Sequence, residues 1–250
     1  MTKLKRILLI ATVLLASATA AVMIYFFWFT PSGYRISVSI HGFSKLTDHV
    51  YVENGWNGKP EELLATLEEA RQRVTELFGG MESAPTLIIC DNEHKIKRLG
   101  GDHDTMTLLI NGVHSYTSLS SEFLTADVLA HEMTHAETHQ RIYQNSTDTS
   151  SIPIWFDEGL AVQNDYRDPY SNETWLKLTD NGQNIPSLSE FGSGETFFSG
   201  STEDRRARYC LAGHEVSKWL EKNGRSGLLS LLKRVNQGES FSELYFAVSP

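Results

Sequence analysis

The sequence predicts an α+β fold, with a small sheet in the first half of the domain, a helical second half and one transmembrane helix in front. Three observations lead to this prediction. The chain opens with a long uncharged run, strand and helix patterns follow it as far as residue 110, and only helix patterns follow from residue 125. The 250 residues are 40% hydrophobic, which is enough for one core, so we expect residues 31–250 to form a single domain after an N-terminal segment of residues 1–30.

The N-terminal segment has the pattern of a membrane anchor. Lys3, Lys5 and Arg6 precede an uncharged run from Ile7 to Thr30. As a helix this run is about 36 Å long, against a hydrocarbon core of roughly 30 Å. Basic residues stay on the cytoplasmic side, so the pattern predicts a single-pass cell-membrane protein whose domain lies in the periplasm or on the cell surface. The small residues Ala18-Thr19-Ala20 leave one alternative, a cleaved signal peptide and a secreted protein.

The net charge argues against one class of partner, and the two cysteines leave the question of a disulfide open. The net charge is −9 for the whole chain and −12 for residues 31–250, which hold 19 basic and 31 acidic residues. This balance is unlike that of a nucleic-acid-binding protein, so no nucleic acid is expected as a partner. Cys90 and Cys210 could form a disulfide in an oxidising compartment or remain two buried thiols, and their spacing does not decide between these.

The first half of the domain shows strand patterns and one helix pattern. Apolar residues alternate over residues 34–40, so we expect a half-buried strand there, with Val50–Val52 as its partner. An apolar stripe at helical spacing predicts a helix from Pro60 to Phe78, closed by Gly79. The other expected strands are Pro85–Cys90 and Thr107–Ile110, the second ending at an Asn111-Gly112 turn.

The second half shows helix patterns separated by polar loops. A long helix is expected over residues 125–143, and another begins after Pro153. The Gly- and Ser-rich residues 192–202 are expected to form a mobile loop. Later helices are expected over residues 205–222, 226–236 and 240–247.

The segment His131-Glu132-Met133-Thr134-His135 carries the chemistry. In a helix the two histidines lie one turn apart on one face, so both imidazoles can bind one Zn²⁺, and Glu132 lies beside them as a base for a zinc-activated water. Catalytic zinc usually takes three protein ligands. His139 lies about 12 Å from His131 along the helix, too far for zinc–nitrogen bonds of about 2 Å, so we expect it to pack or to lie outside the ligand shell.

Glu158 is the better third ligand. It lies in Ile154–Ala161, a helix pattern that follows Pro153, and Gly159 would allow close approach to the histidine helix. A set of two histidines and one glutamate leaves an open coordination position for water. Asp157 has two interpretations, a support for a metal ligand or a solvated carboxylate at the start of a helix.

With these motifs the sequence resembles the gluzincin zinc metallopeptidases, specifically the peptidase MA-like proteins related to the catalytic domain of aminopeptidase N. The resemblance runs from about Pro85 to Val248 and depends on the HExxH segment and on Trp155-Phe156-Asp157-Glu158-Gly159-Leu160-Ala161. It implies a zincin-like fold, one Zn²⁺ per chain on His131, His135 and Glu158, and Glu132 as general base. It also implies that Tyr209 stabilises the oxyanion. Packing of Tyr209 on the core is an equal alternative, and His214 is a second candidate for the oxyanion role.

Two features of related families are absent. The G-x-M-E-N strand motif that binds a free amine in aminopeptidases is missing, since residues 107–113 are T-L-L-I-N-G-V, so the resemblance does not imply exopeptidase specificity. The thermolysin-type aspartate four residues after the ligand glutamate is replaced by Val162. The groups that orient the histidine rings must therefore lie elsewhere.

The expected function is that of a membrane-anchored zinc metallopeptidase acting on peptide or protein substrates, which could pair with an edge strand near Leu108–Val113. Two alternatives stay open. The chain could be a non-catalytic binding or scaffold protein that keeps the peptidase fold, or a zinc hydrolase acting on a non-peptide bond.

Overall fold

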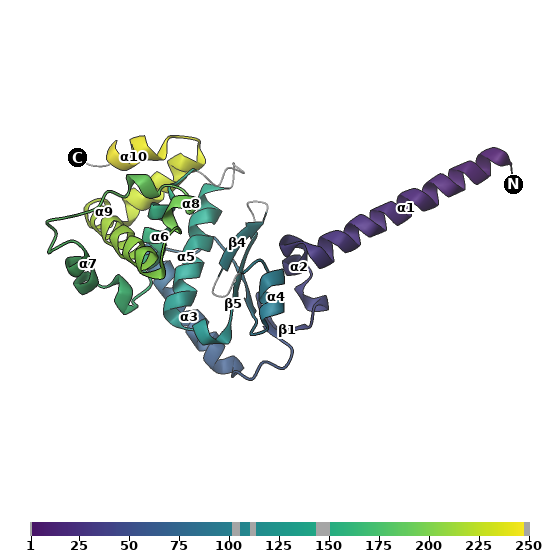
Figure 1. Ribbon diagram of the computed structural model, residues 1–250, viewed down its shortest axis with the longest axis horizontal. Coiled ribbons are helices and arrows are strands. Elements are labelled where there is room, and N and C mark those ends of the chain that lie inside the picture. The colour runs from purple at the N-terminus through teal and green to yellow at the C-terminus, as the bar shows by residue number, and fades with distance from the viewer. Residues whose placement is uncertain (1, 102–105, 111–113, 144–150, 248–250) are drawn as a thin grey trace.

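A computed structural model describes residues 2–101, 106–110, 114–143 and 151–247. The architecture is mixed α/β and mostly helical, with one five-stranded sheet. Figure 1 shows the sheet between two groups of helices, with the long helix α1 (Lys3–Phe29) projecting away from the remainder. The expected combination of a small sheet in the first half, a helical second half and one N-terminal apolar helix is therefore confirmed.

The sheet has the strand order β1-β2-β3-β5-β4. Its strands are β1 (Phe43–Thr47), β2 (Val50–Glu53), β3 (Thr86–Ile89), β4 (Met106–Ile110) and β5 (His114–Leu119). The central pairs β2–β3 and β3–β5 are parallel, whereas the outer pairs β1–β2 and β4–β5 are antiparallel. β4 is therefore an edge strand, as expected for Thr107–Ile110, and the expected Asn111-Gly112 turn lies outside the described residues.

Helices cover both faces of the sheet. One face packs against α3 (Pro60–Phe78) and α5 (Ala126–Ile142) in the main hydrophobic core. The other face packs against α2 (Pro31–Ile36), a 3₁₀ turn at Val38–Ile40, and α4 (Glu93–Arg98). Successive residues of β3 alternate between the two cores, because side chains along a strand point to opposite faces: Leu87 and Ile89 face α3 and α5, and Ile88 faces α2 and α4.

The remaining helices are α6 (Ile154–Val162), α7 (Asn172–Leu178), α8 (Gly194–Phe197), α9 (Thr202–Asn236, with non-helical backbone at Gly224) and α10 (Phe241–Ala247). Among these helices, α6 and α9 pack on α5, α7 and α10 contact α9, and α8 contacts α6. α6 contacts both α5 and α9.

The close approach at Gly159 differs from the expectation. A Cβ atom on Gly159 would lie 2.5 Å from the carbonyl oxygen of Ala212 and 2.7 Å from Val216, both on α9. Gly213 of α9 has the matching relation to α6, since a Cβ there would clash with Val162. The glycine therefore lets α6 approach α9 and not, as the sequence analysis expects, the histidine helix.

Helix α1 is long and apolar enough to cross a membrane, and it is the one such helix among the described residues. Its end is tied to the domain. His41 Nε2 lies 3.1 Å from the carbonyl oxygen of Phe27, and Arg98 Nη1 donates to the carbonyl oxygen of Trp28 at 3.1 Å. The His41 ring also stacks on Tyr34 of α2 at 3.9 Å between centroids. No flexible linker therefore separates α1 from the domain.

The prediction of a strand over residues 34–40 is wrong. Pro31 occupies the first turn of α2, where its missing N–H costs nothing, and Thr30 Oγ1 accepts a hydrogen bond from the Gly33 N–H at 3.1 Å. This capped start makes the segment helical. Val50–Val52 does lie in a strand, β2, but its antiparallel partner is β1.

Burial in this segment follows the alternation only in part, since Tyr34 and Val38 are buried as predicted. Arg35 is fully buried, whereas Ile36 and Ile40 are 47% and 62% exposed. The buried guanidinium donates to the carbonyl oxygens of Leu99 and Tyr116, so its polar groups are satisfied. Arg35 occupies a polar position of the alternating pattern, yet it is buried in a helix. The alternation therefore does not indicate a strand here.

Most other expected elements are present. The structure confirms a strand at Pro85–Cys90. It also confirms the helices expected over residues 60–78, 125–143, 205–222, 226–236 and 240–247. The sequence analysis misses β5 and α4, and residues 192–202 hold the short helix α8 within the expected loop. Cys90 and Cys210 are both buried and free.

Candidate metal centre

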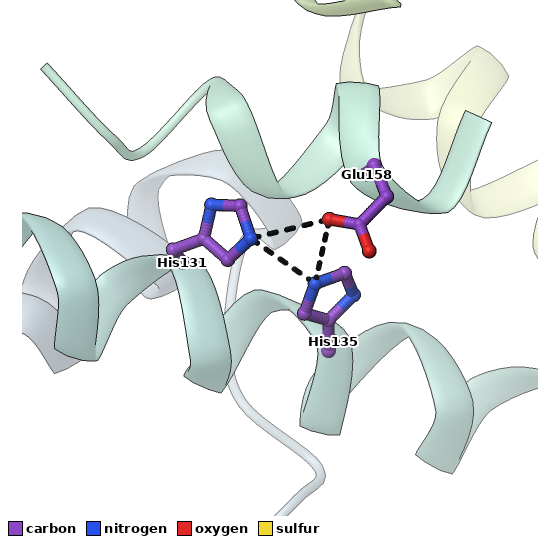
Figure 2. A group of neighbouring side chains, drawn as sticks. All are labelled: His131, His135 and Glu158. Carbon is purple, nitrogen blue, oxygen red and sulfur yellow. Dashed lines mark hydrogen bonds and ion pairs between the residues drawn. The ribbon is translucent and has the colours of Figure 1, made fainter. Parts of the chain in front are cut away.

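Two neighbouring helices carry the motif residues. Thr125 caps the start of α5 by accepting a hydrogen bond from the Val128 N–H at 3.3 Å, and His131 and His135 follow one turn apart on the face toward α6. Pro153 precedes α6, which carries Glu158 one turn into the helix. All three side chains are buried. In Figure 2 the two imidazoles point from α5 toward the Glu158 carboxylate.

The three facing atoms form a nearly equilateral triangle. His131 Nε2 and His135 Nε2 are 3.2 Å apart, and each lies 3.3 Å from Glu158 Oε2. This Oε2 atom is buried and makes no well-aligned hydrogen bond with a described residue, so all three atoms are directed at a common point.

These distances fit a tetrahedral metal ion. Zinc bonds of about 2.0–2.1 Å at tetrahedral angles place neighbouring ligand atoms about 3.4 Å apart. The observed edges of 3.2 and 3.3 Å agree with that value. The triangle also leaves one tetrahedral direction open for a water molecule or a substrate atom, as in catalytic zinc sites.

An aspartate lies within ion-pair distance of the Nδ1 atom of each ring, although neither contact is aligned as a hydrogen bond. His131 Nδ1 lies 3.2 Å from Asp165 Oδ2, and His135 Nδ1 lies 3.1 Å from Asp157 Oδ2. A carboxylate at Nδ1 keeps the proton there and leaves the lone pair on Nε2, the form that binds a metal. The chemistry of the donor set therefore fits zinc as well as the distances do.

Asp157 connects a further histidine to this centre. His139 Nε2 lies 2.9 Å from Asp157 Oδ2, on the same oxygen that faces His135. Asp157 is buried, so its interpretation as a solvated carboxylate is wrong, and its contact with His135 agrees with the other interpretation, a support for that histidine. His139 lies outside the triangle, as its position along the helix predicts.

Asp165 and Arg167 are the residues that the sequence analysis misses. Arg167 donates from Nε to Asp165 Oδ1 at 2.7 Å, and this bidentate pair holds the aspartate that faces His131. A spacing signal was present. Asp165 follows Glu158 by seven residues, which is two helical turns, so both would lie on one face if α6 were extended past Val162.

The electrostatics of the cluster follow from its geometry. Burial alone would lower the pKa of His131, but its contacts with Asp165 and Glu158 outweigh burial and raise the pKa to about 9. Burial would raise the pKa of Glu158, but the two histidines lower it to about 2. Carboxylates thus stay ionised, and the histidines hold protons that a metal cation can displace.

A cleft of about 660 Å³ opens beside the triangle. Glu132 is buried and lines it together with both histidines and Glu158. Tyr209 of α9 lines it too, with its ring centroid 6.0 Å from that of His131. Burial and then the Glu158 carboxylate raise the pKa of Tyr209, so its phenol stays protonated and can act as a donor.

His214 is not part of this cleft. Its ring stacks on Trp175 at 3.6 Å between centroids, and it lines two other cavities, one of which is also lined by Arg167 and Tyr170 of the cleft wall. The prediction of His214 as a second candidate for the oxyanion role is therefore wrong, because it lies on a face of α9 different from that of Tyr209.

No protein-family model matches the sequence, and no curated protein is significantly similar to it. Function is therefore inferred from the residues and their geometry.

Proposed function

We propose that this protein is a zinc-dependent metallopeptidase of the gluzincin type, anchored to a membrane by α1. One observation carries the proposal, the triangle of His131 Nε2, His135 Nε2 and Glu158 Oε2 with edges of 3.2 and 3.3 Å. The aspartate behind each histidine supports it further, because a binding site selected for zinc needs rings held in the metal-binding tautomer.

When bound, zinc supplies a Lewis acid that polarises the scissile carbonyl group and lowers the pKa of a water molecule. Glu132 then has the role of general base. It is the neighbour of His131 in α5 and lines the same cleft, so its carboxylate can take a proton from the attacking water and pass it to the leaving amine.

Tyr209 is the proposed donor to the oxyanion. Its phenol lines the cleft on the side of α9, opposite the helix that carries Glu132. A donor in that position stabilises negative charge that develops only in the transition state, so its contribution would appear in kcat.

A peptide is the proposed substrate because an edge strand of the sheet contacts the helix that carries the zinc motif. β4 is an edge strand of the sheet and contacts α5, so an extended peptide could add to it and lie across the cleft. Amide protection of β4 on binding of a peptide inhibitor would support this pairing, whereas unchanged exchange would exclude it.

The first test is the metal content of the full-length protein, purified in detergent and measured by plasma mass spectrometry. We expect about one zinc per chain in the wild type, a sharp loss in Glu158→Ala, and no loss in Glu68→Ala, which removes an exposed carboxylate of α3. A folded wild-type protein without zinc would refute the proposal. Equal zinc in all three proteins would show that another group is the third ligand.

The second test separates an enzyme from a scaffold protein. Glu132→Gln is expected to retain zinc and to lose peptide hydrolysis, because the amide cannot accept the proton. Wild-type protein that binds zinc and hydrolyses no peptide would instead favour the scaffold interpretation, or a hydrolase of another bond if ester or amide substrates are turned over.

A further inference from the structure

Two arginines line the cleft on the side of α9. Arg205 and Arg206 lie in the first turns of this helix, are exposed to solvent, and form part of the cleft wall. They precede Tyr209 by four and three residues. Residues at these spacings are neighbours on one face of a helix, with Cβ atoms about 5–6 Å apart. A group bound beside Tyr209 therefore lies within reach of both guanidinium groups.

In the part of the chain that the structure describes, neither arginine is neutralised by an ion pair. Among the described residues, Arg205 donates to the hydroxyl of Thr202 at 3.2 Å, and no ion pair engages it or Arg206. Among the described residues, the arginines that do form ion pairs are Arg73, Arg141, Arg167 and Arg234.

The charge of the surroundings makes this pair unusual. Residues 31–250 carry a net charge of −12, so most of the surface repels anions. Arg167, the third arginine of the cleft wall, is already committed to Asp165 through a bidentate contact. Arg205 and Arg206 are therefore the cationic groups of the described cleft wall that remain available to a ligand.

We infer that Arg205 and Arg206 bind a carboxylate of the peptide substrate close to the scissile bond. This inference rests on the proposed function, because the position of the scissile bond comes from the metal site. The carboxylate has two possible sources, an aspartate or glutamate side chain, or the free C-terminus of a short peptide. Guanidinium groups bind both through charge-assisted hydrogen bonds.

The test measures binding separately from turnover. Full-length Glu132→Gln in a zwitterionic detergent is titrated with peptides that share one core sequence and carry glutamate or glutamine beside the central bond, each with a free or an amidated C-terminus. We expect a carboxylate to strengthen binding about tenfold, as a charge-assisted hydrogen bond does. If affinity differs between the glutamate and glutamine peptides, the carboxylate is a side chain. If it differs between the free and amidated peptides, the carboxylate is the C-terminus.

Variants locate the effect. Adding Arg205→Gln and Arg206→Gln together should abolish the preference, whereas Arg71→Gln, at an exposed position of α3 outside the cleft wall, should keep it. Equal affinity for all four peptides, absence of measurable binding, or a preference that persists in the double variant would overturn the inference.

Hydrolysis by the wild type distinguishes this failure from failure of the proposed function. Cleavage of all four peptides with no carboxylate preference in binding or in kcat/KM leaves the peptidase intact and removes the arginine site. A carboxylate preference in binding without any cleavage has the opposite meaning, since it supports the arginine site and counts against peptide hydrolysis.

Discussion

Replacing Gly159 by alanine tests how Glu158, the proposed third zinc ligand, is held in position. The added Cβ would lie 2.5 Å from the Ala212 carbonyl oxygen, whereas ordinary contacts begin at 3.4 Å, so α6 and α9 must separate locally by about 0.9 Å. The nearest obstacle is the backbone of α9, which cannot rotate away as a side chain can. The helices themselves therefore have to move.

Two effects of known size compete at this position. Overpacking costs about 1–3 kcal/mol, whereas alanine in a helix interior gains about 1 kcal/mol over glycine. The free energy of unfolding is therefore expected to fall by about 0–2 kcal/mol. Glu158 is the preceding residue, so the same displacement shifts its carboxylate relative to the two Nε2 atoms, and zinc affinity should fall by at least about tenfold.

The assay combines urea unfolding followed by circular dichroism with zinc competition against a chromogenic chelator. Gly194→Ala is the matched control, because a Cβ there would meet the Phe198 ring at 3.6 Å, an ordinary contact distance. It should leave both stability and zinc affinity close to the wild-type values. If Gly159→Ala also left both unchanged, the spacing of α6 and α9 would not be what positions Glu158.

Three further predictions concern the site. Tyr209→Phe should lower kcat by about 10²–10³-fold with little change in KM, because the lost donor acts on the oxyanion. If steady-state kinetics show an unchanged kcat, Tyr209 only packs against the core. Asp165→Asn should weaken zinc binding by about 10- to 100-fold in chelator competition, and equal affinity would show that Asp165 does not orient His131. The pKa of His131 is raised from 6.5 to about 9, so its proton stabilises the metal-free fold fully below pH 6.5, and this contribution is lost as the pH rises toward 9. Zinc competes with that proton, so its effect on Tm should be larger at about pH 8 than at about pH 6; an equal effect at both would contradict this coupling.

The sequence predicts the part of the site that depends on helix periodicity. His131 and His135 lie one turn apart within a single helix, and Pro153 marks the start of the helix that carries Glu158. Asp165 was missed because α6 ends at Val162, and the loop beyond it returns to His131 only in three dimensions. Local spacing within a helix is readable from the sequence, whereas the course of a loop is set by tertiary packing.

The same difference between local pattern and tertiary contact explains which strands could be predicted from the sequence. Strand β3 is a continuous apolar run and was predicted, but β5 contains Ser115, Thr117 and Ser118, which are buried and polar. Its strand conformation comes from hydrogen bonding to β3 and β4 on either side and leaves little trace in hydrophobicity. At Arg35 the conflict is sharper, because tertiary contacts bury a charged residue that an alternating pattern places in solvent.

The packing of α1 against the domain has a consequence for which bonds can be cut. If α1 spans a membrane, the contacts of Phe27 and Trp28 with His41 and Arg98 hold the cleft at one height above the bilayer. If the protein is the proposed peptidase, it would then select bonds in membrane-anchored substrates by their distance from the lipid surface as well as by their side chains. A flexible insertion after Thr30, combined with His41→Ala and Arg98→Ala to remove these contacts, should broaden the cleavage sites on a membrane-anchored substrate while leaving hydrolysis of a free peptide unchanged. An unbroadened pattern would refute selection by distance from the membrane.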